Sequence, residues 1–295
     1  MENLNSFERS LKPRAVEEFL DYYFYRRVAH RMVPVLIRMR LSPNQVTSLS
    51  LAAGLVAAWF ALQSHFFASA FFSLFAIFLD CSDGQIARLT GKSSHLGHIL
   101  DGFCDMLWIT ALWFAIHLSG YFQKSGFEWM LGVMSAAAAS MFLHCWRFDG
   151  VKNFILKWSG NKAADNPLTL ADYRKLFSRS LKEQKWGEAT LCAIMLFQLF
   201  FFVWESHGEK IVSLSPGKRD LLRETMEPVL SGWSWIGEGH HNTVVMAGLF
   251  LAPLSPYPLI VSFLVILLPM NLWYLYCEAR WRNSLKGLRK KGVEV

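Results

Sequence analysis

Residues 80–105, DCSDGQIARLTGKSSHLGHILDGFCD, place four aspartates between two apolar segments. Residues 66–79, FFASAFFSLFAIFL, precede this stretch, and residues 106–116, MLWITALWFAI, follow it. An ionisable side chain at the centre of a membrane helix costs about 2.5–3.5 kcal/mol on insertion scales. Four carboxylates in so short a stretch therefore indicate that these residues form a functional site.

Apolar segments recur along the chain, which has 295 residues, of which 53% are hydrophobic, and a mean hydropathy of +0.24. A membrane-spanning helix needs about 20 apolar residues. We predict an all-α polytopic membrane protein with six core transmembrane helices and one further apolar segment that is re-entrant, broken or interfacial. The candidate segments are Val46–Ser64, Phe66–Leu79 extended through the polar motif to about Gly91, Ile99–Phe122, Phe127–Trp146, Ala189–Trp204 and Asn242–Cys277, the last interrupted by PLSPYP.

Residues 14–40 mix apolar and basic residues at helical spacing, which predicts an amphipathic helix on the membrane surface, bent at Pro34. A solvated helix without a function is the alternative. LSPNQVT, residues 41–47, then predicts a turn and a helix cap that lead into the first span. We expect a cytoplasmic N-terminal segment over 1–42, a membrane domain over 43–285 and a basic cytoplasmic tail over 286–295.

The formal net charge is +7, and the basic residues flank the predicted spans. They gather before the first span, after the fourth and at the C-terminal end, so the positive-inside rule places these three segments and both termini in the cytoplasm. Charges that flank spans do not form one patch, which argues against a nucleic-acid partner. The five cysteines show no pairing pattern and are typical of small buried hydrophobic residues.

Helical geometry places the four carboxylates on two faces. Asp80 and Asp83 share one face, and Asp101 and Asp105, spaced four residues apart, share another. The short polar turn LTGKSS, residues 89–94, would join two antiparallel helices and bring these faces together. Facing carboxylates repel unless cations lie between them, and Mg²⁺ or Mn²⁺ prefers oxygen ligands.

The carboxylates have two other interpretations. A structural salt-bridge cluster is disfavoured because Arg88 is the one arginine nearby. A transporter or a cation pathway stays open on the carboxylates alone, although the sequence shows no inverted repeat of the kind that many transporters contain.

The complete spacing Asp80-x2-Asp83-Gly84-x2-Ala87-Arg88-x8-Gly97-x3-Asp101-x3-Asp105 resembles the signature of the CDP-alcohol phosphotransferases. SPNQVT, residues 42–47, is similar to the Pro-Asn-x-x-Thr that opens the first span of that family. The resemblance covers about residues 20–150. It implies a six-helix membrane fold, a homodimer and an active site open to the cytoplasm. The implied reaction transfers a substituted phosphate from a CDP-linked donor, such as CDP-diacylglycerol, to an alcohol acceptor and releases CMP.

The resemblance also implies roles for individual residues. Two ions, Mg²⁺ or Mn²⁺, would be held by Asp80, Asp83, Asp101 and Asp105, with Asp105 also the catalytic base. The nucleotide would lie against Asn44, Thr47, Gly84, Ala87, Arg88 and Gly97. Arg147 is a weaker candidate for binding the acceptor, because a basic cytoplasmic loop is expected there in any case.

The acceptor alcohol is left open by the sequence. RRVAHRMVPVLIRMRLSPNQVT, residues 26–47, resembles the inositol-phosphate-type branch of the family. Choline/ethanolamine-type transfer onto diacylglycerol is the alternative, since that branch shares Thr90, Ser93, Ser94, Leu96, Gly97 and Cys104, but it carries histidine where this chain has Gly102. The adjacent His240 and His241 in GEGHHNT invite a zinc interpretation, but neighbouring helical side chains point about 100° apart and rarely share one metal.

Overall fold

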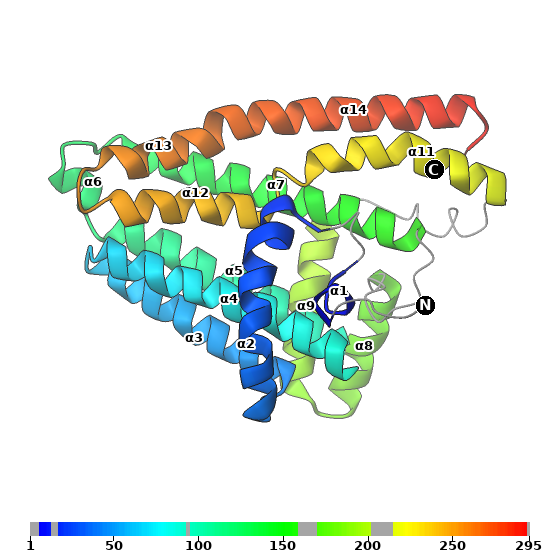
Figure 1. The fold of residues 1–295 in the computed structure, drawn as a ribbon, viewed down its shortest axis with the longest axis horizontal. Helices are drawn as coiled ribbons and strands as arrows, with labels where there is room; N and C mark the ends of the chain where they lie inside the picture. The colour runs from blue at the N-terminus through cyan, green and yellow to red at the C-terminus, as the bar shows by residue number, and fades with distance from the viewer. Residues whose placement is uncertain (1–5, 13–16, 93–94, 159–169, 202–214, 294–295) are drawn as a thin grey trace.

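The computed structural model describes residues 6–12, 17–92, 95–158, 170–201 and 215–293. Helices account for all the regular structure in these ranges, so the predicted all-α class is confirmed (Figure 1). The elements are α1 (Ser6–Arg9), the π-helical turn η2 (Asp21–Tyr25), α2 (Arg26–Arg38), α3 (Pro43–Leu62), α4 (Phe66–Thr90), α5 (His95–Leu118), α6 (Tyr121–Lys124), α7 (Met130–Trp158), α8 (Leu170–Lys182), α9 (Trp186–Phe201), α11 (Pro216–Trp233), α12 (Glu238–Leu251), α13 (Tyr257–Val265), the π-helical turn η3 (Ile266–Met270) and α14 (Asn271–Lys290).

The predicted cap before the first span is present. The Gln45 backbone N–H donates to Ser42 Oγ at 3.4 Å, and the Ser42 N–H donates to Gln45 Oε1 at 2.8 Å. This reciprocal capping box, with Pro43 at the first helical position, begins α3 shortly after α2 ends at Arg38. The residues predicted near the nucleotide, Asn44 and Thr47, therefore lie in the first turns of α3.

α4 carries the polar motif at its C-terminal end. α4 has 25 residues and is about 37 Å long at 1.5 Å per residue, which exceeds the hydrocarbon thickness of about 30 Å. Gly91 ends α4 in the left-handed conformation with φ of 65°, and the Lys92 N–H donates to Ala87 O at 3.0 Å. α5 then packs against α3, which also packs against α4, and the carboxylates of Asp80 on α4 and of Asp101 and Asp105 on α5 lie close together, as predicted.

Four helical segments in the described ranges are long and apolar enough to cross a membrane: 43–62, 66–90, 100–124 and 257–290. The predicted count of six spans stays a prediction. The region 242–277 contains the end of α12, a break at 252–256, and the start of a continuous helix through α13, η3 and α14. The last three residues predicted for the segment 189–204 lie outside the described residues.

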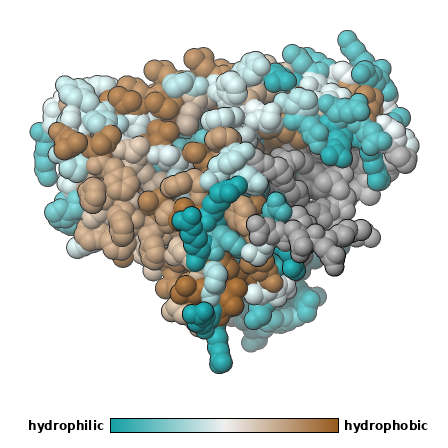
Figure 2. Space-filling view, in the orientation of Figure 1, coloured by the Kyte–Doolittle hydropathy of each residue, from teal (hydrophilic) through white to brown (hydrophobic). Residues whose placement is uncertain are grey.

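The surface agrees with a membrane setting. Figure 2 shows hydrophobic side chains gathered over the part of the molecule formed by α3, α4 and α5, and hydrophilic side chains over α11 and the C-terminal end of α14. Phe67, Phe71 and Phe75 are exposed along one stripe of α4. Such a stripe at a spacing of four residues suits contact with lipid tails.

α2 crosses α4 (Figure 1), and it buries Ala29, Val33 and Leu36 on one side. This stripe agrees with the predicted amphipathic helix, and Pro34 lies inside α2, which continues to Arg38. α11, which the sequence analysis did not predict, packs with α7 and α14 around a second apolar cluster that contains the buried Trp233 and Trp281. The domain boundaries at 42 and 285 stay a prediction.

Candidate active site

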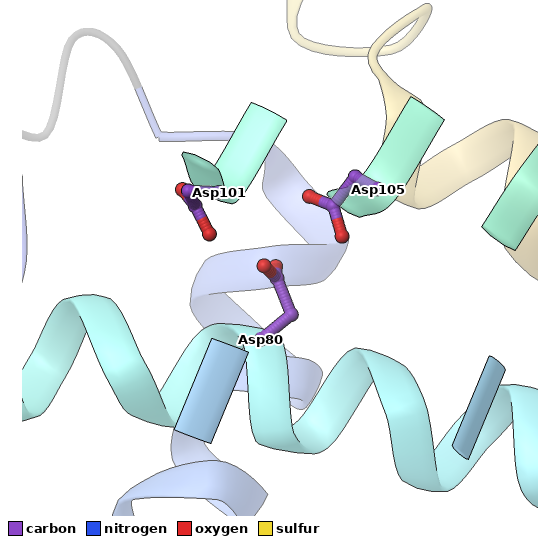
Figure 3. Close-up of side chains that lie close together, drawn as sticks. All are labelled: Asp80, Asp101 and Asp105. Carbon is purple, nitrogen blue, oxygen red and sulfur yellow. The ribbon is translucent and has the colours of Figure 1, made fainter. Parts of the chain in front are cut away.

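Three of the four aspartates converge between α4 and α5. Asp80, Asp101 and Asp105 each offer one carboxylate oxygen, and these oxygens lie within 4.8 Å of one another. Figure 3 shows Asp80 rising from α4 toward Asp101 and Asp105 of α5. The spacing of four residues puts the two α5 carboxylates one turn apart on one face, which is why both reach the same point.

The fourth aspartate is buried beside α3. The Asp83 carboxylate accepts a hydrogen bond from the Thr47 hydroxyl, and Thr47 Oγ1 also lies 3.1 Å from Pro43 O. Asp83 is 4% exposed, so α3 and α4 enclose this carboxylate. The structure therefore connects Thr47 to the aspartate motif, while Asn44, one turn earlier, is exposed.

The carboxylate cluster fits a divalent cation. Asp101 Oδ1 is buried, and it has no hydrogen-bond partner among the described residues. A buried polar atom without a partner is unfavourable, and closely spaced carboxylates repel one another. A donor set made of oxygens alone suits hard cations such as Mg²⁺ or Mn²⁺. The chemistry of this cluster thus supports the ion type predicted from the sequence.

Trp108 is a neighbour of the cluster that the sequence analysis missed. Its indole Nε1–H donates to Asp105 Oδ1 at 3.2 Å, and the side chain is buried. Gly54 of α3 makes room for this ring, because a Cβ at Gly54 would lie 2.5 Å from Trp108 Cγ. An aromatic donor three residues after an intramembrane aspartate was the signal available in the sequence.

Arg88 lies one turn beyond Asp83, near Gly84. A Cβ at Gly84 would lie 3.1 Å from a terminal nitrogen of Arg88, so a larger residue there would press on the guanidinium. Arg88 Nε–H donates to the backbone carbonyl of Ser10 at 2.5 Å. Ala87 and Gly97 are half-buried, and Gly97 lies one turn before Asp101 on α5. Ser93 and Ser94 lie outside the described residues.

Arg147, the candidate for the acceptor, has a buried partner. Its Nε–H donates to Glu278 Oε2 of α14 at 3.0 Å. The guanidinium lies 5.4 Å from the ring centroids of both Trp233 and Trp281. The acceptor role stays a prediction, and an acceptor that binds Arg147 must compete with Glu278.

The adjacent histidines have different neighbours. His241 donates through Nδ1 to Gly237 O at 2.8 Å, and its Nε2 lies 3.0 Å from Nδ1 of His144 on α7. His240 Nδ1 lies 3.7 Å from the carboxylate of Glu18. The two rings therefore point to different partners, as the helical spacing predicted.

These features define the class of protein: an all-α membrane fold that holds a cluster of half-buried aspartates. A family model described as CDP-alcohol phosphatidyltransferase matches residues 40–215, which is more than half of the chain. This protein belongs to that family.

One curated relative is similar to part of this chain. The chain is 36% identical over 91 residues to the archaetidylinositol phosphate synthase of Pyrococcus horikoshii. The match covers 30% of this chain and 48% of the relative, so the chain spans about half the length of that relative. No solved structure matches this chain.

Proposed function

We propose that this protein transfers a substituted phosphate from a CDP-linked donor to an alcohol acceptor, with release of CMP, in the synthesis of phospholipids or related phosphodiesters. The convergence of Asp80, Asp101 and Asp105 within 4.8 Å, in a member of the CDP-alcohol phosphatidyltransferase family, carries this proposal. In the reaction the acceptor oxygen forms a bond to the β-phosphorus of the donor. The bond from that phosphorus to the bridging oxygen breaks, and CMP leaves.

Metal binding belongs to this proposal. Asp80, Asp83, Asp101 and Asp105 would hold two ions, Mg²⁺ or Mn²⁺, that neutralise charge on the diphosphate and on the departing CMP. Asp83 is included among the proposed metal ligands because it lies one turn from Asp80 on α4. The Thr47 hydroxyl donates to its carboxylate and orients it. That contact gives Thr47 a role in shaping the site.

Asp105 takes the proton of the acceptor hydroxyl. Its Oδ1 accepts from Trp108, which leaves Oδ2 able to accept the proton. Arg88 binds the donor diphosphate with its terminal nitrogens, since a guanidinium matches phosphate oxygens in a forked geometry. Gly84, Ala87 and Gly97 leave space for the nucleotide, and Asn44 at the exposed start of α3 completes its contacts.

The acceptor proposed here is a phosphorylated polyol of the inositol phosphate type. The name of the Pyrococcus horikoshii relative states the product archaetidylinositol phosphate, which suggests this acceptor. The proposed donor is a CDP-linked lipid. The site and both termini face the cytoplasm, where the water-soluble acceptor is present, and the protein acts as a homodimer. These statements are proposals supported by family membership and by the basic segments that flank the spans.

The test is CMP release by the purified protein in lipid nanodiscs. We expect release from a CDP-linked lipid with Mg²⁺ or Mn²⁺, loss with EDTA, and loss in Asp80→Asn and Asp101→Asn. Asp149→Asn is the matched control, because this aspartate is 65% exposed and lies in a different helix from the cluster.

Two outcomes would contradict the proposal. CMP release that persists in both cluster variants would remove the carboxylates from catalysis. Cation flux into sealed vesicles that depends on the same aspartates, without CMP release from any CDP-alcohol, would favour the transporter interpretation. Turnover with diacylglycerol and a CDP-linked amino alcohol would instead support the choline/ethanolamine-type reaction.

A further inference from the structure

The N-terminal segment reaches the proposed donor site. Ser10 is fully buried, and its backbone carbonyl accepts the Arg88 Nε–H at 2.5 Å across 78 residues of sequence. The turn that contains Ser10 is closed by two bonds to Phe7 O, from the Ser10 N–H at 3.0 Å and from its hydroxyl at 2.6 Å. The direction of the Ser10 carbonyl is therefore fixed by the fold of this turn. We call residues Ser6–Lys12 the strap.

A polar chain ties the strap to the helix that carries Arg88. Ser6 Oγ lies 3.2 Å from His30 Nε2, His30 Nδ1 lies 3.2 Å from Gln85 Oε1, and the Gln85 amide donates to Arg26 O at 2.8 Å. One neutral tautomer of His30 satisfies both ring contacts, because Nδ1–H donates to Gln85 while Nε2 accepts from Ser6. Gln85 precedes Arg88 by one turn of α4, so strap, α2 and α4 form one connected unit.

An aromatic contact strengthens the same attachment. The Phe7 ring meets the His30 ring edge-on at 5.4 Å, and the Arg27 guanidinium lies 5.3 Å from the centre of the Phe7 ring. Contacts of this kind are favourable beyond the area they bury. Phe7 is therefore the side chain that fixes the strap on α2, while Ser10 makes the contact to Arg88 through its backbone.

The segment after the strap is fixed at a second place. The Glu18 carboxylate accepts the Gly239 N–H at 3.0 Å at the start of α12, and its other oxygen lies 3.6 Å from Lys152 Nζ. A Cβ at Gly237 would overlap this carboxylate, which explains the glycine there. Burial raises the pKa of Glu18, but His240 and Lys152 lower it more, so the pKa lies below its usual value and the anchor is charged.

We propose that the strap is a positioning element of the donor site, in which the Ser10 carbonyl holds Arg88 by Nε so that its terminal nitrogens are presented to the donor diphosphate. This inference rests on the proposed function, which assigns Arg88 to the donor. An arginine has a long flexible side chain, so fixing Nε before the donor arrives reduces the conformational freedom that binding must remove. The contribution should appear in donor affinity, because Ser10 does not touch the reacting atoms.

The experiment compares four proteins in nanodiscs: wild type, a deletion of residues 1–11, a control deletion of residues 1–5 that keeps the strap, and Arg88→Ala. The measurements are CDP affinity by calorimetry, which needs no turnover, and kcat with KM for donor and acceptor. We expect the longer deletion to weaken CDP binding and raise donor KM about tenfold or more, as loss of a hydrogen bond to a charged group does. Acceptor KM and kcat should stay within about threefold, and the shorter deletion should match wild type.

A combined variant tests the connection itself. If the strap acts through Arg88, deleting residues 1–11 in the Arg88→Ala background should weaken CDP binding no further, because coupled residues are not additive. Additive losses would overturn the inference. Phe7→Ala is measured in parallel and should weaken CDP binding in the same direction. This variant decides the question if the deletion does not fold.

Three results separate the possible failures. Unchanged CDP affinity in the deletion, together with weaker binding in Arg88→Ala, would overturn the role of the strap and leave the proposed function intact. Tighter CDP binding in the deletion would also overturn it, because the strap would then compete with the donor for Arg88. Unchanged CDP affinity in Arg88→Ala itself would contradict the proposed assignment of that arginine, and with it this inference.

Discussion

Replacing Arg147 by alanine should destabilise the protein strongly, while replacing Arg282 should not. Both arginines bind the same carboxylate: Arg147 Nε lies 3.0 Å from Glu278 Oε2, and Arg282 Nε lies 2.8 Å from Oε1. The distances are similar, but the side chain of Arg147 is 4% exposed and that of Arg282 is 63% exposed. The comparison therefore contrasts a buried arginine with an exposed one that binds the same carboxylate.

The size of the effect follows from this difference. Removing one partner of a buried ion pair costs about 3–5 kcal/mol, because the remaining charge is left uncompensated. Arg147 also contacts the rings of Trp233 and Trp281, and cation–π contacts contribute about 0.5–2 kcal/mol each. Because Arg282 still binds Glu278 after the change, we expect a loss near the lower end, about 3 kcal/mol. The exposed pair of Arg282 should make no measurable difference.

The assay is reversible unfolding in mixed detergent micelles, followed by tryptophan fluorescence and circular dichroism. A double variant, Arg147→Met with Glu278→Leu, should recover most of the stability, since apolar replacement of a whole buried pair is often neutral. A loss below about 1 kcal/mol in Arg147→Ala, or an equal loss in Arg282→Ala, would refute the reasoning. If Arg147 also serves the acceptor, Arg147→Lys should raise acceptor KM, because lysine does not reproduce the forked geometry of the guanidinium.

Asp83→Asn should reduce turnover below about a tenth of wild type, because it removes a proposed metal ligand. The protein should stay folded, because the change removes a buried negative charge. Kinetics at saturating Mg²⁺ and a melting curve test this, and retained turnover would argue against a ligand role. Gly97→Leu should block CDP binding more than folding, because a side chain there would occupy ligand space one turn before Asp101; unchanged affinity by calorimetry would place Gly97 outside the site. Asp105→Asn should lower kcat by about 10²-fold or more, since positioned bases contribute about 10²–10⁴, and should keep donor binding better than Asp80→Asn does. Trp108→Phe keeps the packing near Gly54 but removes the hydrogen-bond donor to Asp105. We expect lower kcat with unchanged CDP affinity, and an unaltered kcat would show that this hydrogen bond does not assist catalysis.

The convergence of the aspartates could be predicted because it depends on local geometry. Residues spaced three or four apart share a helix face, and a short turn makes neighbouring helices antiparallel. Asp80, Asp101 and Asp105 obey both rules, and the structure brings their oxygens together. The capping box at Ser42 could be predicted for the same reason, since its partner is three residues away.

Contacts between distant parts of the chain could not be predicted in this way. Arg88 and Ser10 are 78 residues apart, and the contact uses a backbone carbonyl that any residue type would offer. Arg147 appeared in the sequence as a cytoplasmic basic residue, because composition reveals a charge but not Glu278, 131 residues later, as its partner. The glycines of GEGHHNT lie against the carboxylate of Glu18, a contact that the sequence does not reveal because Glu18 precedes Gly239 by 221 positions.

The anchoring of Glu18 at Gly239 sets an order of events during synthesis. The two residues are separated by 221 positions, and a ribosome adds about 5–20 residues each second. The start of the chain must therefore wait on the order of ten to forty seconds before its docking site at α12 has been made. In the later part of that interval α3, α4 and α5 can already lie in the bilayer with their carboxylates in place, while the segment that contacts Arg88 has no anchor at α12. Nascent chains arrested before α12 should therefore leave the N-terminal segment open to proteases, and chains released after α12 should protect it.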